Sequence, residues 1–130
     1  VYHEFPNLPT QGTIYKILAS RQGENIAPLV ETMLTEDTYC SLAGNELVQI
    51  INKKATKWNG IQMMLRACNI STEDAVYFGD DNDDIEALKQ CGTGVAVANA
   101  IDAVKEAADV VVESNDEDGV AKWIERNLLA

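Results

Sequence analysis

The spacing of apolar residues along the chain changes character near residue 53. Before that point, alternating positions predict strands, and apolar residues at helical spacing predict one helix. The elements expected there are a strand at 13–19, a helix at 24–34 and two strands at 38–42 and 46–51. The short Ala43-Gly44-Asn45 link between the last two strands is typical of a hairpin. Residues 1–53 are therefore predicted to form an α+β layer with an antiparallel hairpin.

After residue 53, helices alternate with short strands that are apolar throughout, which is typical of parallel strands covered on both faces. Helices are expected at 57–67, 83–90, 101–108 and 120–129, and strands at 75–78, 95–97 and 110–112. Such alternation predicts βα units in a doubly wound sheet. The predicted fold class is α/β, with a partial, Rossmann-like parallel sheet flanked by helices on both faces. Asn99 is interpreted as the N-cap of the helix at 101–108.

Four carboxylates lie within five residues directly after the strand at 75–78, namely Asp80, Asp81, Asp83 and Asp84. Parallel sheets bind ligands at the carboxyl ends of their strands. Clustered like charges repel one another unless a cation neutralises them, and Mg²⁺ prefers oxygen ligands of this kind. Acidic residues also cap helices and complement the helix dipole, although a cap uses only one side chain. The residues alone leave a metal site and a set of helix caps open.

Several motifs, taken in order, resemble phosphatases of the haloacid dehalogenase superfamily, and in particular its Cof-type members. The motifs are Ala55–Gly60, Gly79-Asp80-x-x-x-Asp84 with Ile85–Leu88, Gly94–Ala100, Val104–Val111 and Asn115–Ala121. The resemblance is close over residues 54–130 and looser over residues 1–53. It implies that 1–53 are the C-terminal part of an α+β cap, and that 54–130 are the C-terminal half of the core.

The resemblance also implies a role for individual residues. Asp80 and Asp84 would hold Mg²⁺, and Asp81 would orient those ligands without touching the metal. Lys57 would pair with the nucleophile and the substrate phosphate, although Lys53 and Lys54 compete for this role by position alone. Asp83 would lie at the phosphate, where Cof-type members usually carry Asn, so that its extra negative charge should weaken anion binding.

The function implied is part of a Mg²⁺-dependent phosphohydrolase acting on a small phosphorylated metabolite, such as a sugar phosphate, through an aspartyl-phosphate intermediate. The family's Asp-x-Asp nucleophile has no counterpart here, because Asp81–Asp83 belongs to the acidic turn and Asp116–Asp118 matches the family's tail. We therefore expect a fragment that is inactive alone. The alternatives are a non-catalytic relative that only binds metal or a partner and, more remotely, a response-regulator receiver domain.

Charge and hydropathy narrow the set of partners. The formal net charge is −11, from 21 acidic and 10 basic residues, which argues against nucleic acid and anionic membranes as partners. No apolar run reaches the ~18 residues of a membrane span, and a cytoplasmic location is expected. In the family the strand at 75–78 lies beside the nucleophile strand. An apolar edge there predicts self-association or pairing with a missing N-terminal segment.

Overall fold

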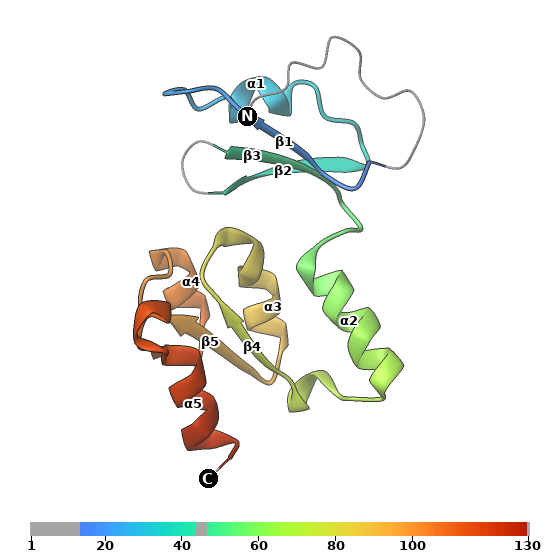
Figure 1. Ribbon diagram of the computed structural model, residues 1–130. Helices are drawn as coiled ribbons and strands as arrows, with labels where there is room; N and C mark the ends of the chain where they lie inside the picture. The colour runs from blue at the N-terminus through green and yellow to red at the C-terminus, as the bar shows by residue number, and fades with distance from the viewer. Residues whose placement is uncertain (1–13, 44–46, 130) are drawn as a thin grey trace.

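The computed structural model describes residues 14–43 and 47–129, which form two sheets joined through one long helix (Figure 1). The first layer contains β1 (Ile17–Ser20), α1 (Ala27–Glu31), β2 (Thr38–Ala43) and β3 (Leu47–Asn52). The second contains α2 (Lys57–Cys68), β4 (Val76–Gly79), α3 (Ile85–Gln90), β5 (Thr93–Val97), α4 (Asp102–Ala107), β6 (Val110–Val112) and α5 (Gly119–Asn127). Short 3₁₀ helices lie at η1 (Thr72–Asp74), η2 (Asn82–Asp84) and η3 (Asn115–Glu117).

The first sheet is antiparallel, with the strand order β1-β3-β2. This confirms the predicted hairpin between β2 and β3, whose link lies partly outside the described residues. Helix α1 packs on the sheet by placing Ala27 and Val30 against the fully buried Val48. Residue 13 of the predicted first strand lies outside the described residues. From residue 14 on, pairing with β3 begins only at Ile17, and α1 spans only Ala27–Glu31, so the predicted strand and helix were both too long.

The second sheet is parallel, with the order β4-β5-β6. Its core is formed by Leu88 of α3, Ala96 of β5 and Val104 of α4, none more than 1% exposed. Trp123 of α5 packs edge to face on Phe78 of β4, with ring centroids 5.5 Å apart. These contacts confirm the α/β class and the parallel βα units.

Two predictions for this sheet were wrong in detail. Strand β6 is not fully buried, since Val110 is 38% and Val111 is 50% exposed. Within the described residues β6 pairs only with β5, so it is an edge strand with an incompletely covered face. Asn99 is not a helix cap either, because α4 begins at Asp102 and its N-cap residue is Ile101.

Strand β4 also has one partner, β5, among the residues that the structure describes. Its other edge is therefore open in this part of the chain, as predicted for the strand at 75–78. Self-association through that edge stays a prediction. None of the described helices combines the length and the hydropathy that a membrane crossing requires.

Helix α2 begins at a well-formed cap, which matters because Lys57 is its first residue. The Thr56 hydroxyl accepts a hydrogen bond from the Asn59 backbone N–H at 3.1 Å, and the Asn59 amide donates to the Lys54 carbonyl at 3.1 Å. At the other end, Asn69 takes a left-handed conformation with φ of 53° and ends the helix. The cap therefore fixes where the chain turns into α2 and where Lys57 starts.

We predict that Thr56→Ala lowers the free energy of unfolding by about 1 kcal/mol, because the Asn59 N–H loses its acceptor. Urea denaturation followed by circular dichroism measures the change. Thr56→Ser keeps the hydroxyl and should stay within about 0.5 kcal/mol of wild type. Equal stability of the Ala and Ser variants would show that this cap does not hold the start of α2.

Candidate active site

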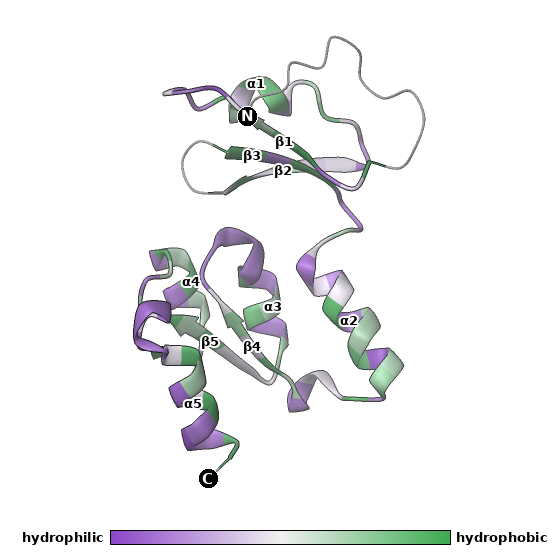
Figure 2. Cartoon of the chain, in the orientation of Figure 1, coloured by the Kyte–Doolittle hydropathy of each residue, from purple (hydrophilic) through white to green (hydrophobic). Residues whose placement is uncertain are grey.

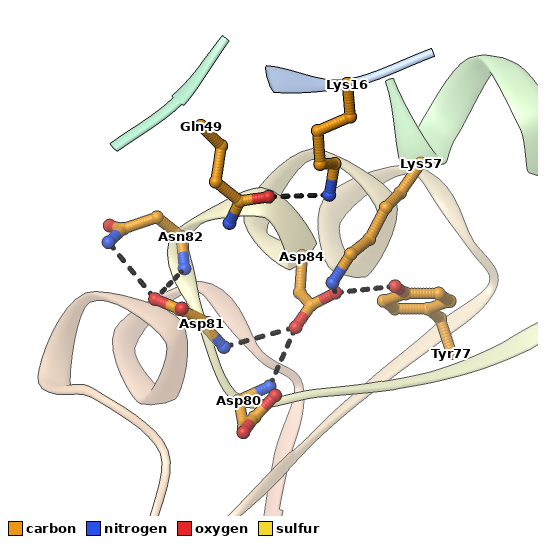
Figure 3. A network of polar contacts seen from close by, with 8 residues as sticks. All are labelled: Lys16, Gln49, Lys57, Tyr77, Asp80, Asp81, Asn82 and Asp84. Carbon is orange, nitrogen blue, oxygen red and sulfur yellow. Dashed lines mark hydrogen bonds and ion pairs between the residues drawn. The ribbon is translucent and has the colours of Figure 1, made fainter. Parts of the chain in front are cut away.

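The first residue of α2 meets the acidic turn that follows β4. The Lys57 ammonium forms an ion pair with Asp84 Oδ1, and the side chains of Lys57 and Asp84 are 47% and 3% exposed (Figure 3). Lys53 and Lys54 form no ion pair within the described residues. Of the three lysines that compete by position, the structure thus brings Lys57 to the carboxylates.

Asp84 is the buried centre of this turn. Besides Lys57, its carboxylate accepts hydrogen bonds from the Tyr77 hydroxyl at 2.6 Å and from the backbone N–H groups of Asp80 at 3.0 Å and Asp81 at 3.1 Å. Burial by itself raises the pKa of Asp84, but Lys57, Tyr77 and the two N–H groups together hold this pKa below its usual value. The carboxylate is charged, and each of its oxygens receives two donors.

A glycine makes this burial possible. A Cβ added to Gly79, the last residue of β4, would lie 2.6 Å from Asp84 Cβ and 3.0 Å from Asp84 Cγ. Gly79 is itself buried. The glycine of the Gly79-Asp80 pair is therefore required by the close approach of Asp84, and this explains its place in the motif in steric terms.

The Asp80 side chain is oriented differently from that of Asp84. Its carboxylate points away from that of Asp84 (Figure 3), and the residue lines a cleft of 260 Å³ together with Asn99 and Asn115. The Asp80 carbonyl accepts the Ile101 N–H at 3.1 Å, which ties the turn to the segment after β5. Asp80 is exposed, in contrast to Asp84.

The structure thus does not bring Asp80 and Asp84 to one point. Within residues 14–43 and 47–129, no three His, Cys, Asp or Glu side chains converge as a cation site. Because Mg²⁺ is commonly held by one or two carboxylates together with water and phosphate, the exposed Asp80 fits a metal ligand. Asp84 fits less well, since its lone-pair positions are already used by four donors.

The two remaining acids do different things. Asp81 accepts the Asn82 N–H at 2.7 Å and forms a capping box with Asp84 at η2, so it stabilises the turn. Asp83 lines a second cavity together with Lys57 and Tyr39. Burial first, and then the charges of Asp83 and Glu86, raise the pKa of the Tyr39 hydroxyl. Figure 2 shows the hydrophilic acidic turn directly after the apolar strand β4.

The sequence did not assign Tyr77 or Asn115 to the site, and for Asn99 it favoured a helix cap over a place at the rim of the site. Tyr77 lies in the apolar strand β4, where nothing in the sequence pattern sets its hydroxyl apart. Asn99 Oδ1 accepts the Asn115 N–H at 3.1 Å, which brings two loops together beside Asp80. The available signal was the position of Asn99 two residues after β5, near the carboxyl end of a parallel strand.

Comparison with known proteins gives a consistent result. Residues 3–124 match a family model described as haloacid dehalogenase-like hydrolase. A putative phosphatase of Haemophilus influenzae is 32% identical over 127 residues, which are 95% of this chain and 47% of that protein. Pyridoxal phosphate phosphatase YbhA of Escherichia coli is 42% identical over 77 residues, 59% of this chain and 26% of that protein.

Solved structures agree with these matches. A haloacid dehalogenase-like hydrolase from B. subtilis matches with a TM-score of 0.77 and 28% identity over 88% of this chain and 40% of that chain. The chain spans about half the length, or less, of the relatives named here.

We predict that Gly79→Ala lowers the free energy of unfolding by about 2 kcal/mol, because the new methyl group overlaps a side chain that has no room to move. Chemical denaturation measures the loss. Gly60→Ala is the matched control, since nothing lies within 4 Å of its added Cβ and the site is helical. That control should gain about 0.5–1 kcal/mol. Two variants of equal stability would contradict the close packing of Asp84 on Gly79.

Proposed function

Because this chain belongs to the haloacid dehalogenase-like hydrolases, we propose that it is part of a magnesium-dependent phosphohydrolase acting on a small phosphorylated metabolite. The observation that carries the proposal is the Lys57–Asp84 pair, which presents a half-exposed ammonium beside an acidic turn at the end of a parallel strand. An ammonium has three donors, so Lys57 can hold Asp84 and a phosphate oxygen together.

We assign different roles to the two aspartates of the motif. Asp80 is the proposed metal ligand, and a bound Mg²⁺ would neutralise charge on the phosphoryl oxygens. Asp84 is the proposed positioning residue, because it orients the Lys57 ammonium and holds the N–H groups of Asp80 and Asp81. This assignment modifies the expectation that both carboxylates bind the metal. Asp81 stays in its supporting role.

Asp83 is proposed to face the substrate, since it lines the same cavity as Lys57. A carboxylate there repels a phosphate dianion, and Lys57 offsets that repulsion. The repulsion by Asp83 and the attraction by Lys57 together should favour substrates whose phosphate contacts both Lys57 and the metal.

Hydrolysis also needs a nucleophile, for which we propose an aspartate delivered by a strand pairing with the open edge of β4. The aspartate would then carry the phosphoryl group before water removes it. We expect the 130 residues alone to bind phosphate without turning over an ester. In the same proposal, residues 1–53 belong to a cap and residues 54–130 to the core, in line with the two separate sheets.

The small size of the substrate is supported by the two cavities at the acidic turn, each about 260 Å³. This volume lies just below the roughly 300 Å³ at which typical small-molecule sites begin. The E. coli relative named as a pyridoxal phosphate phosphatase is consistent with a metabolite of this size.

We predict that Mg²⁺ raises the melting temperature of the chain. For a Kd of about 1 mM, 10 mM Mg²⁺ adds about 1.4 kcal/mol to the native state, which is a rise of roughly 5 °C in Tm. Asp80→Asn should abolish the rise because the proposed ligand is gone. Differential scanning fluorimetry against KCl of equal ionic strength measures it.

Asp74→Asn is the charge-matched control, because Asp74 is exposed in η1 just before β4, at the end of the strand opposite the acidic turn. It should keep the full magnesium response. An unchanged melting temperature in wild type, or an equal response in Asp80→Asn, contradicts the metal assignment. Inorganic phosphate should raise Tm further only when Mg²⁺ is present and Lys57 is intact.

A further inference from the structure

The cavity between the first sheet and the acidic turn has a composition that the proposed phosphate site does not explain. We call it the tyrosine cavity, and define it by Tyr15, Lys16 and Tyr39 on the side of the antiparallel sheet, with Lys57 and Asp83 on the side of the acidic turn. Lys57 is thus shared with the phosphate site. A substrate whose phosphate is bound at Lys57 can therefore place the rest of its atoms in this cavity.

Lys16 is a cation held in place without a carboxylate. Its ammonium donates to Gln49 Oε1 of β3 at 2.6 Å (Figure 3), and it forms no ion pair within the residues that the structure describes. One of its three donors is used by Gln49, and two remain for a ligand. The lining carries two lysines and one aspartate, a local positive excess in a chain of net charge −11.

The two tyrosines supply ring surface. Tyr15 is 86% exposed, and Tyr39 is half-buried across the same cavity. Phenol rings give a large contact area to a flat ligand with little loss of conformational entropy. Burial and the nearby charges of Asp83 and Glu86 raise the pKa of Tyr39, so its hydroxyl stays protonated at neutral pH and can donate a hydrogen bond.

We propose that the tyrosine cavity binds the alcohol part of the substrate, and that this part is a ring bearing a second anionic group. Tyr15 and Tyr39 contact the ring, and Lys16 pairs with the second anion, a carboxylate or a second phosphate. The inference rests on the proposed function, since it takes the ester phosphate to be bound at Lys57. It makes Lys16 a specificity-determining residue for a small, doubly anionic phosphomonoester.

The test compares two esters that differ in one group, phenyl phosphate and 4-carboxyphenyl phosphate, by titration calorimetry on the 130-residue chain with Mg²⁺. Wild type should bind the carboxylated ester roughly fivefold more tightly, which is the effect of one partly exposed ion pair. In Lys16→Met the ratio should fall to about one. Tyr39→Leu should weaken both esters.

Lys53→Met is the matched control, because Lys53 is exposed and does not line the cavity, and it should keep the fivefold ratio. Equal affinity of the two esters in wild type, or an unchanged ratio in Lys16→Met, overturns the inference. Inorganic phosphate separates the two claims. If inorganic phosphate binds in the presence of Mg²⁺ but the two esters bind with equal affinity, only the proposal for the tyrosine cavity is contradicted. If inorganic phosphate does not bind, the proposed function is contradicted as well.

Discussion

A single buried carboxylate connects the parts of this site. Asp84 accepts hydrogen bonds from the backbone N–H groups of Asp80 and Asp81, from the Tyr77 hydroxyl of β4 and from the Lys57 ammonium at the start of α2. A carboxylate whose side chain is only 3% exposed is stable in the charged form only if such donors replace its lost water. The backbone of the turn, the Lys57 ammonium and the Tyr77 hydroxyl are all directed at this one charge.

The same requirement explains the local sequence. Gly79 lacks a side chain because Asp84 occupies the space beside it, and Thr56 begins α2 so that Lys57 reaches the turn. Asp81 caps the 3₁₀ turn that carries Asp84. The spacing between Gly79-Asp80 and Asp84 therefore lets the Asp84 carboxylate fold back onto the backbone N–H groups of Asp80 and Asp81.

Much of the second layer could be predicted from the sequence, because short apolar strands that alternate with helices leave few other arrangements. The strands β4, β5 and β6 and the helix α2 lie close to their predicted positions. The exposure of Val110 and the true start of β1 could not be predicted, since both depend on which strand is the neighbour. Apolar spacing carries no information about neighbours in space.

The candidate site was predicted in its composition more than in its geometry. Charge density identified the acidic turn, and the family resemblance selected Lys57. Neither indicated that the Asp84 side chain is buried while Asp80 is exposed. The donors that hold Asp84 in place include Tyr77 and Lys57, which lie seven and 27 residues before it in the sequence. The contact between Asn99 and Asn115 was not predicted for the same reason, since it joins two separate loops.

The central claim is that Asp80 binds the metal while Asp84 only positions Lys57. It is tested most directly by diffraction from crystals of the chain soaked with Mn²⁺ and a phosphate mimic, with the anomalous signal locating the ion. We expect an ion about 2.1 Å from an Asp80 carboxylate oxygen, with Lys57 contacting the mimic and still paired with Asp84. An ion bridging Asp80 and Asp84, or one that contacts neither, would contradict it.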